Sequence, residues 1–464
     1  MCNVSLNGTQ PTDASIRVLR ALEAAGLEAW YVGGWVRDAL MGRPSHDVDM
    51  CCSGLWQESK EALEAADIAV VESGIKFGGI TAICDDERIE VTTYRLDGIY
   101  TDGRHPQSVE RAASLEDDLA RRDFTVNAMA WHPERGLVDR YDGQGDLDRK
   151  LIRAVGDPKR RFNEDALRML RAVRFACRLD FMIEPKTKQA LAECAPLLDA
   201  VARERVGIEL DGILSTGHGG DAMLRYPELI CAAVPELAAG RGFDQRSVYH
   251  AFNVYEHIAR VLTVAGELAL CDGFTPSMSL MWAAFLHDVS KPDCFTVDHA
   301  GGGHFYGHPE LGAKKARAIM DRLALSHDLV RDVCLLIKYH DKPLRPERSC
   351  LLNMMRLLSG EGVDTPRLMD ELMDLKRADT LGKAPSCFYY VETIEEMRSL
   401  AHDLLEAGEP YSLKMLAING GDLIRAGVKP GPELGQLLNA ALEAVIEDNI
   451  PNDRETLLVH LNLN

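Results

Sequence analysis

The stretch Tyr31-Val-Gly-Gly-Trp-Val-Arg-Asp38, followed by His46-Asp47-Val-Asp49, is the most informative part of the chain. Its pattern predicts a short strand, a glycine turn, the first turn of a helix, and a second strand that carries two acids. Gly33 and Gly34 leave room for a phosphate to approach the backbone closely. The guanidinium of Arg37, just inside the predicted helix, can donate to a triphosphate oxygen.

Asp47 and Asp49 stand two residues apart on the predicted second strand, so both carboxylates point to the same face. Neighbouring carboxylates repel each other, and a hard divalent cation relieves that repulsion. Paired acids beside a phosphate-binding turn describe a site for metal-assisted phosphoryl or nucleotidyl transfer. The alternative is a plain glycine turn and a solvated Asp-x-Asp, because Asp-x-Asp alone is a common sequence.

The combination of Gly-Gly-x-Val-Arg-Asp with a following Asp-x-Asp resembles the signature of a nucleotidyltransferase superfamily. This superfamily contains the tRNA CCA-adding enzymes and the bacterial poly(A) polymerases. The resemblance implies that Asp47 and Asp49 hold two Mg²⁺ ions, and that Gly34 and Arg37 bind the triphosphate of a nucleotide. It also implies that the partners are tRNA, CTP and ATP.

Length and composition limit the possibilities further. With 464 residues, 46% of them hydrophobic, the chain can form several cores and more than one domain. A net charge of −20 excludes nucleic-acid binding over the whole surface. Basic residues are instead concentrated between Arg149 and Arg178, where ten Lys or Arg residues accompany three Asp or Glu residues. RNA binding, if present, is expected there.

The cysteines and the hydropathy pattern indicate in which cellular compartment the protein is found. Twelve cysteines are scattered without a Cys-x-x-Cys pair, which suits a reducing cytoplasm and indicates neither a disulfide framework nor a zinc knuckle. The sequence shows no signal peptide and no long apolar run. We therefore expect a cytoplasmic protein with no membrane partner, while the oligomeric state stays open.

Hydrophobic periodicity outlines the rest of the N-terminal part. It predicts helices at 13–26 and 56–66 and strands at 30–32, 79–84 and 89–94. Glu90, on the last of these strands, is either a third acid that supports the metals or an ordinary solvent-facing residue. Residues 95–118 are polar and rich in turn residues, which predicts a mobile loop.

A second motif follows this loop. In Arg121-Arg-Asp-Phe-Thr-Val-Asn-Ala128, Arg122 could reach a triphosphate and Asp123 could accept a hydrogen bond from a ribose hydroxyl. The alternative is an exposed cluster of ion pairs. The pattern resembles the ribose-selection motif of the same family, which favours the functional interpretation.

The third motif is Phe162-Asn-Glu-Asp-Ala-Leu-Arg-Met-Leu-Arg-Ala-Val-Arg-Phe-Ala176. Asn163 is expected to cap a helix whose first turn holds Glu164 and Asp165. Polar residues then recur at every third position along this helix, and neighbours in the series share a face. The series consists of Asp165, Arg168, Arg171 and Arg174. A helix surface with ion pairs would explain the same pattern.

The chemistry of the bases argues for function instead. Cytosine and adenine both present an amino donor beside a ring-nitrogen acceptor, whereas uracil and guanine present the reverse. A carboxylate at Asp165 beside a guanidinium at Arg168 would fit C and A and oppose U and G. The motif is similar to the base-reading motif of the family, which implies that Arg171 and Arg174 also contact the nucleotide. Val201–Val206 resembles a buttress for this helix, and Glu184 is expected to be exposed and outside the site.

The C-terminal half contains a further set of metal-ligating residue types. Imidazoles and carboxylates occur on five predicted helical segments, and one His-Asp pair is adjacent. This set resembles the HD metal-dependent phosphohydrolase fold, in which one or two transition-metal ions could activate water on a phosphate ester. The expected ligands are His257, His287, Asp288, His308, His340 and Asp379.

These patterns together predict an α+β fold. A small N-terminal nucleotidyltransferase head with a mixed sheet (14–146) is followed by an elongated all-α body, which comprises a helical neck for base recognition and RNA binding (147–245), an HD domain (246–385) and a tRNA-binding tail (386–464). The expected reaction is template-independent CCA addition to tRNA from CTP and ATP. The alternatives are a bacterial poly(A) polymerase, an enzyme that adds only CC or only A, or mainly an HD phosphohydrolase. CC-adding relatives shorten the loop before the Arg-Arg-Asp motif, and here it has full length.

Overall fold

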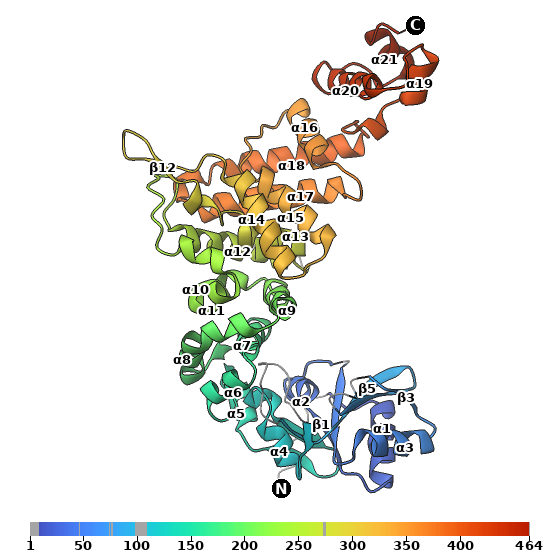
Figure 1. Cartoon of the computed structure of the whole chain (residues 1–464), viewed down its shortest axis with the longest axis vertical. Coiled ribbons are helices and arrows are strands. Elements are labelled where there is room, and N and C mark those ends of the chain that lie inside the picture. Colours follow the sequence, from blue (N-terminus) through green and yellow to red (C-terminus); the bar gives the residue numbers. More distant parts are fainter. Residues whose placement is uncertain are drawn as a thin grey trace. The chain divides into compact units, whose positions relative to one another are not determined.

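The computed structural model describes residues 9–45, 47–73, 75, 78–97, 109–271 and 275–463. The chain divides into two compact units. The first comprises Met1–Leu210 with Tyr226–Ala233, and the second comprises Asp211–Arg225 with Val234–Asn464. Figure 1 shows that the first unit holds the large β-sheet and that the second is built mainly of helices. The α+β fold predicted from the sequence is confirmed.

The first unit is organised around a mixed seven-stranded sheet with the strand order β3-β4-β5-β2-β1-β8-β9. Only β2 and β5 run parallel to each other, and the other neighbours are antiparallel. The strands are β1 (Ala29–Val32), β2 (Val48–Cys52), β3 (Ala69–Val71), β4 (Gly79–Cys84), β5 (Glu87–Thr93), β8 (Met129–His132) and β9 (Gly136–Asp139).

The two faces of this sheet carry different layers, because side chains alternate along each strand. One face packs on α1 (Asp13–Ala24), α2 (Gly34–Leu40) and α3 (Trp56–Ala65), which share a core with Tyr31 and Met50. The alternate residues Trp30 and Cys51 pack on the other side against α4 (Leu115–Ala120). Asp49 alternates with Met50, so its carboxylate lies on the α4 side of the sheet.

The segment 95–118 differs from the mobile loop that its polarity predicts. Arg95–Asp97 forms β6, which pairs with β7 (Val109–Arg111), and Leu115 begins α4. Ser114 caps α4 by accepting from the backbone N–H of Asp117. Residues 98–108 of the expected loop lie outside the described residues. Polarity alone did not reveal the short strands, since two residue triplets carry little periodicity.

The predicted boundary at residue 146 falls inside a short helix, α5 (Gly143–Asp148), which follows the 3₁₀ helix η2 (Thr125–Asn127) in the chain. Beyond it, β10 (Leu151–Ile152) pairs in parallel with β11 (Met182–Ile183). The remaining elements up to residue 240 are helical. They are α6 (Pro158–Glu164), α7 (Arg168–Leu179), α8 (Pro185–Cys194), η3 (Ala195–Ala200), α9 (Arg203–Leu214), α10 (Gly219–Arg225), α11 (Pro227–Ala233) and η4 (Pro235–Gly240).

The helix predicted across 163–176 is interrupted. Asn163 does not cap it but lies inside α6 and donates to the carbonyl of Lys159. Asp165 is extended, with φ −144° and ψ 106°, and it terminates α6. Its carboxylate accepts from the backbone N–H of Leu167, a local bond that competes with helix formation. The arginine series therefore begins a new helix, α7, and Asp165 stands in the break before it.

In the second unit, α13 (Met278–Leu286) is the central helix: all its residues from Ser279 to Leu286 are buried. It packs on α12 (Val254–Cys271), α15 (His327–Tyr339) and α17 (Thr365–Gly382). The further helices are η5 (Lys291–Asp293), α14 (His308–Arg322), α16 (Arg348–Leu358), η6 (Pro385–Cys387), α18 (Tyr390–Glu406), η7 (Leu413–Met415), α19 (Gly420–Arg425), α20 (Pro432–Glu447) and α21 (Arg454–His460).

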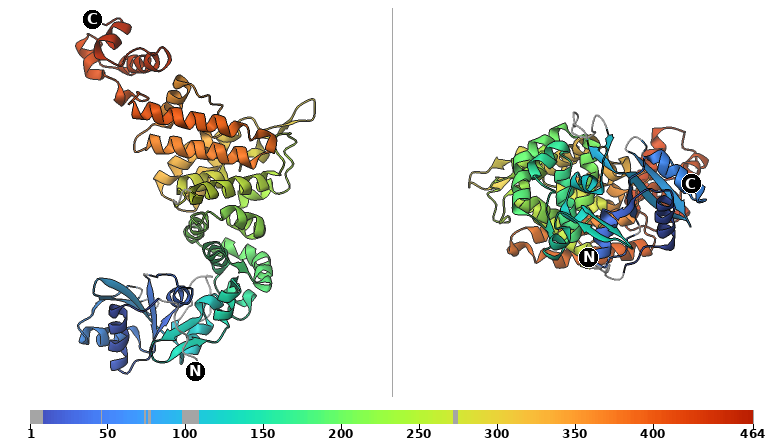
Figure 2. Two further views of the ribbon diagram at one scale, coloured as in Figure 1. Left: turned by 180° about the vertical axis from the view of Figure 1, so that it is seen from behind. Right: turned by 90° about the horizontal axis from the view of Figure 1, so that it is seen from below.

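The second unit contains one departure from the all-α expectation. A two-stranded ribbon, β12 (Thr296–Val297) with β13 (Gly303–His304), projects between η5 and α14. Figure 2 shows that the long helices of this unit otherwise lie side by side, with α18 on α17. None of the helices in the described part of the chain is long and apolar enough to cross a bilayer.

Candidate active site

A cavity of about 680 Å³ opens in the first unit, on the side of the sheet that carries Asp49. The glycine turn after β1, the start of α2, strands β2 and β5, the segment after α4, and helices α7 and α9 contribute to it. Nine arginines and six acidic residues are among the side chains that line it, so its walls are rich in charge with an excess of donors. The eleven head and neck residues predicted to hold the metal or bind the nucleotide all line this cavity.

The acidic end of the cavity is built on two parallel strands. Asp49 of β2 stands in register with Glu90 of β5, and Asp47 directly precedes β2. Burial, followed by the nearby charge of Glu90, raises the pKa of Asp49 to about 6, while Arg122 opposes the shift. Carboxylate oxygens are the ligands that a hard divalent cation prefers. Asp47, Asp49 and Glu90 thus supply the donor type that such an ion requires at this end of the cavity.

The glycine turn allows this end to close up. Gly33 adopts φ +68°, a backbone conformation that residues with a side chain rarely adopt. A Cβ at this position would lie 3.0 Å from Nη1 of Arg122 and 3.6 Å from Oδ2 of Asp49. At Gly34 the added Cβ would lie 3.6 Å from Nη2 of Arg37. The two glycines therefore let backbone, guanidinium and acid meet in one place.

Arg37 lines the cavity but is already well partnered. It is 4% exposed, and its Nε and Nη2 donate to the two carboxylate oxygens of Asp38 at 2.8 and 2.9 Å. Its Nη1 donates to Oδ1 of Asn127 at 2.7 Å. The sequence predicted a guanidinium directed at triphosphate, whereas the structure shows one whose position is fixed by two neighbours. Asn127 is a residue that the sequence analysis missed.

Arg121 and Arg122 are half-buried and pair with a buried acid, rather than forming an exposed cluster of ion pairs. Asp118 is fully buried; its Oδ1 accepts from Arg121 at 2.6 and 2.9 Å, and its Oδ2 accepts from Arg122 at 3.0 Å. Although burial opposes ionisation, Arg122 and Arg121 hold the pKa of the Asp118 carboxyl below its ordinary value. Asp118 fixes both arginines at the cavity wall. Its place four residues before Arg122 on a helical segment was the signal that could have found it.

Asp123 joins the head to helix α7. Its Oδ2 accepts from Nε and Nη2 of Arg171 at 3.0 and 2.7 Å, and its Oδ1 accepts from Nδ2 of Asn127 at 3.3 Å. Arg174, one turn further along α7, donates to Glu209 of α9 at 2.6 Å. Each of these two cavity-lining arginines is therefore held by an ion pair with an acid.

Asp165 and Arg168 both line the cavity, and each also contacts the protein. Oδ2 of Asp165 accepts from Arg205 of α9 at 3.2 Å. Arg168 donates to Glu164 at 2.9 Å and to the carbonyl of Arg121 at 3.1 Å. Arg205 lies in the stretch expected to buttress this region. Its direct contact with Asp165 makes it part of the site.

The expectation that Glu184 is exposed is wrong. It is half-buried and caps α8, where its carboxylate accepts from the N–H and the hydroxyl of Thr187 at 2.7 and 2.9 Å. A proline directly after it, which favours the first position of a helix, was the available signal.

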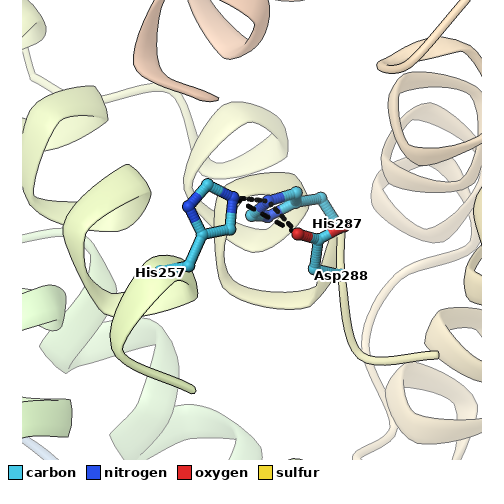
Figure 3. A group of neighbouring side chains, drawn as sticks. All are labelled: His257, His287 and Asp288. Atoms are coloured by element: carbon cyan, nitrogen blue, oxygen red, sulfur yellow. Dashed lines mark hydrogen bonds and ion pairs between the residues drawn. The ribbon is translucent and has the colours of Figure 1, made fainter. Parts of the chain in front are cut away.

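A separate cluster of histidines and acids lies in the second unit, and Figure 3 shows three of its members, His257, His287 and Asp288. Nε2 of His257 lies 3.4 Å from Nε2 of His287, 3.3 Å from Oδ2 of Asp288 and 3.1 Å from Oδ1 of Asp379. The other oxygen of Asp288, Oδ1, lies 3.4 Å from Nε2 of His308 and 3.7 Å from Nε2 of His340. All six residues predicted for this cluster are thus brought together from five helical segments. Five of them form two potential ligand groups that share Asp288, and Asp379 contacts the first group through His257.

The histidines of the cluster are oriented for ligation. Nδ1 of each ring faces a backbone carbonyl: Gly382 for His257 at 3.2 Å, Ala284 for His287 at 2.9 Å, Phe305 for His308 at 2.8 Å and Ile337 for His340 at 2.7 Å. A proton held on Nδ1 by a carbonyl leaves the Nε2 lone pair for a metal. The four Nε2 atoms meet around two buried acids, and this donor set fits a transition-metal ion.

Two lysines complete this cluster, and the sequence analysis missed both. Nζ of Lys291 lies 2.7 Å from Oδ2 of Asp288, and Nζ of Lys383 lies 2.6 Å from Oδ2 of Asp379. Lys291 stands three residues after the adjacent His-Asp pair, a spacing that places it next to Asp288 in a helical turn. Both ammonium groups could hold phosphate oxygens beside a metal.

Comparison with protein families gives four matches along the chain. Residues 29–153 match the Poly A polymerase head domain, and residues 180–239 match the Probable RNA and SrmB-binding site of polymerase A. Residues 254–383 match the HD domain, and residues 387–461 match the tRNA nucleotidyltransferase domain 2. The histidine cluster thus lies in the segment that matches the HD domain, whereas the cavity is lined by the segment that matches the polymerase head and by residues that follow it in the chain.

Similar proteins extend over almost the whole chain. The CCA-adding enzyme of Streptococcus thermophilus is 33% identical over 96% of this chain and 95% of its own length. That of Limosilactobacillus fermentum is 32% identical over 95% and 94%. Among solved structures, the Bacillus stearothermophilus CCA-adding enzyme in complex with CTP has a TM-score of 0.71 at 24% identity, covering 98% of this chain and 97% of its own. The chain therefore belongs to the family of CCA-adding enzymes, which are metal-dependent nucleotidyltransferases.

Proposed function

We propose that the protein adds CCA to the 3′ end of tRNA, using CTP and ATP and no nucleic-acid template. The observation that carries the proposal is the single cavity in which three acids meet an array of arginines. The acids suit a reacting phosphate and its metal, while the arginines suit a nucleotide. The relatives named as CCA-adding enzymes, and the solved structures of such enzymes with CTP, ATP and tRNA, support the choice of substrates.

The acids would hold the metal. Asp47 and Asp49, with Glu90 in register beside Asp49, would bind two Mg²⁺ ions. Bound there, such ions lower the pKa of an attacking hydroxyl and neutralise a leaving pyrophosphate. The residues themselves would orient the reactants. The glycine turn would admit the triphosphate, and Arg122, which Asp118 holds beside this turn, would bind it. No covalent intermediate is required, because positioning and charge stabilisation suffice.

The arginine-lined end would bind and select the nucleotide. Asp123 would accept from the ribose, and Asp165 with Arg168 would read the base. Each carboxylate oxygen of Asp165 has two lone pairs, so its bonds to Leu167 and Arg205 leave capacity for the amino group of C or A. The residues proposed to bind the nucleotide are Gly34, Arg37, Arg122, Asp123, Asp165, Arg168, Arg171 and Arg174.

A bacterial poly(A) polymerase shares the head, and an enzyme that adds only CC or only A would share most of the site. Incubation with tRNA that lacks its 3′ end, with each nucleoside triphosphate separately, distinguishes these. CCA addition predicts incorporation of C but not of U or G, and A only after both C residues are present. Addition of A without C would indicate a poly(A) polymerase instead.

The histidine cluster supports a second activity. Six buried histidines and acids, five of them in two potential ligand groups, and two lysines beside them suit hydrolysis of a phosphate ester at a transition metal, which when bound would activate water. The test is metal analysis of the purified protein, followed by assay of a chromogenic phosphodiester. Protein that takes up neither manganese nor another transition metal at this cluster would remove the proposal.

The four predicted segments are proposed to divide these tasks. The head at 14–146 would carry catalysis, and the neck at 147–245 base reading and RNA contact. The HD domain at 246–385 would bind its own metal, and the segment 386–464 would hold the body of the tRNA. We place the reaction in the cytoplasm, where tRNA maturation supplies the substrate.

A further inference from the structure

Three arginines of the cavity surround one aromatic ring. Phe175 of α7 is 7% exposed, and its ring centroid lies 5.4 Å from Cζ of Arg37, 5.6 Å from Cζ of Arg171 and 4.8 Å from Cζ of Arg174. Phe124 packs edge-on against the same ring, with centroids 5.9 Å apart. Arg37 comes from α2 beside the glycine turn, whereas the other two come from α7. The ring therefore lies between the two ends of the cavity.

A polar path joins the same two ends. Arg37 donates to Asn127 at 2.7 Å, Asn127 donates to Asp123 at 3.3 Å, and Asp123 accepts from Arg171 at 2.7 Å. Because Arg37 and Arg171 both contact Phe175, the path closes into a circuit of five residues. Asn127 and Asp123 are 7% and 9% exposed, so water competes little for these bonds.

Electrostatics explains why the circuit needs the ring. Three guanidiniums that converge repel one another, and each is paired with a carboxylate. Arg37 pairs with Asp38, Arg171 with Asp123, and Arg174 with Glu209. The negative face of an aromatic ring attracts cations at these distances. Phe175 thus supplies a common contact that an aliphatic side chain of similar volume lacks.

We propose that Phe175 and Asn127 are positioning residues that hold Arg37 and Arg171 in one coupled arrangement. The proposal rests on the function proposed above and deepens it: binding of the triphosphate and choice of the base depend on the same circuit. Loss of either residue then weakens both properties together, although neither residue is assigned a contact with the reacting atoms.

The experiment uses the full-length protein and tRNA that ends before CCA. The variants are Phe175→Leu, Phe175→Tyr and Asn127→Ala, and kcat and KM are measured for CTP and UTP. The matched control is Phe162→Leu, since Phe162 of α6 is a buried phenylalanine like Phe175 but does not line the cavity. Melting temperatures of all variants are recorded, so that loss of packing is measured separately from loss of position.

We expect Phe175→Leu and Asn127→Ala to raise KM for CTP about fivefold to thirtyfold, as one lost cation–π or buried polar contact predicts. The preference for CTP over UTP falls together with it, and kcat changes less, because no variant touches Asp47 or Asp49. Phe175→Tyr keeps the ring and restores most of both properties. Phe162→Leu lowers the melting temperature but leaves KM and the preference unchanged.

Three results would overturn the proposal. Phe175→Tyr could be as impaired as Phe175→Leu at an unchanged melting temperature, Phe162→Leu could reproduce the same kinetic changes, or KM could rise without any change in base preference. Failure of the proposed function itself would show differently, because wild-type protein would then not incorporate C.

Discussion

At the scale of single residues, Asp49 combines partial burial with a like-charged neighbour. Its raised pKa, about 6, reflects burial and then Glu90, so the carboxylate is held at an electrostatic cost to the folded protein. Groups with perturbed pKa values are often found at functional sites, because the same group is needed to bind or react with the ligand.

The first prediction follows from this arrangement. Asp49→Ala or Asp47→Ala should lower the rate of nucleotide addition by about 10³-fold or more, as expected for loss of a group that stabilises transition-state charge. Because the repulsion with Glu90 disappears, Asp49→Ala should not lower the melting temperature. Glu61→Ala on α3, an exposed acid of the same unit, serves as the control and should retain full activity. Near-normal incorporation by a folded aspartate variant would remove these residues from the mechanism.

The second prediction concerns base choice. Asp165→Ala removes the acceptor that opposes U and G, so misincorporation of these bases should rise while the total rate falls. Each lost contact should change selectivity by about 5- to 150-fold, equivalent to about 1–3 kcal/mol. Arg168→Ala should weaken C and A together, because both present the same ring acceptor.

Single-nucleotide incorporation with all four triphosphates measures this effect. Glu193→Ala is a better control than a change at Glu184, since Glu193 pairs with Lys159 and accepts from Gln189 at the surface, whereas Glu184 caps a helix. An Asp165→Ala variant that is slower but keeps the wild-type ratio of CTP to UTP would contradict base reading by this carboxylate.

At the scale of elements, the sequence predicted strands β1, β2, β4 and β5 and helices α1 and α3 because their periodicity is strong. The glycine turn, the paired acids and the apolar helix α13 all follow from local patterns. The break between α6 and α7 could not be predicted in this way. A regular arginine spacing argued for one continuous helix, and the local hydrogen bond from Leu167 to Asp165 interrupts it.

The site was predictable where motifs are compact and was missed where contacts are long-range. Asn127 and Arg205 bind Arg37 and Asp165, which lie 90 and 40 positions away in the sequence. Asp118, by contrast, binds Arg122 only four positions away, so a local signal for it existed. The six residues of the histidine cluster were predictable because their chemistry is unusual, even though 122 positions separate His257 from Asp379.

The third prediction tests the glycine turn. Gly33→Ala and Gly26→Ala both force alanine into positive φ, +68° and +80°, and should both lower the free energy of unfolding, Gly33→Ala more strongly because its ψ of −132° lies outside the left-handed helical region. Only the Cβ at position 33 meets Arg122 and Asp49, whereas nothing lies within 4 Å at position 26. Gly33→Ala should therefore also raise KM for CTP, and equal activity of the two variants would contradict a role for the turn in binding.

The fourth prediction tests the convergence of five helical segments on one metal site. His287→Ala with Asp288→Ala should lower the content of bound transition metal and any phosphodiesterase activity, because both potential ligand groups lose members. His304→Ala with Asp298→Ala, an exposed His–Asp pair of the same unit, is the matched control. Unchanged metal content in the first double variant, measured by mass spectrometry of folded protein, would exclude this assignment.

At the scale of the whole molecule, the two sites belong to different compact units. The arginine-lined cavity lies within residues 32–205, and the histidine cluster lies within residues 257–379. Each unit has its own core, so damage to one site should leave the chemistry of the other intact. The charge distribution agrees with this division: a chain with net charge −20 concentrates nine arginines at one cavity.

One measurement tests the central claim most directly. Transfer RNA that ends before CCA is incubated with CTP and ATP together, and the 3′ ends are sequenced after reaction with wild-type protein, Asp49→Ala, and the His287/Asp288 double variant. We predict ends of CCA for wild type and for the double variant, and unextended ends for Asp49→Ala. Runs of A in the wild-type product, or CCA ends made by Asp49→Ala, would contradict the account.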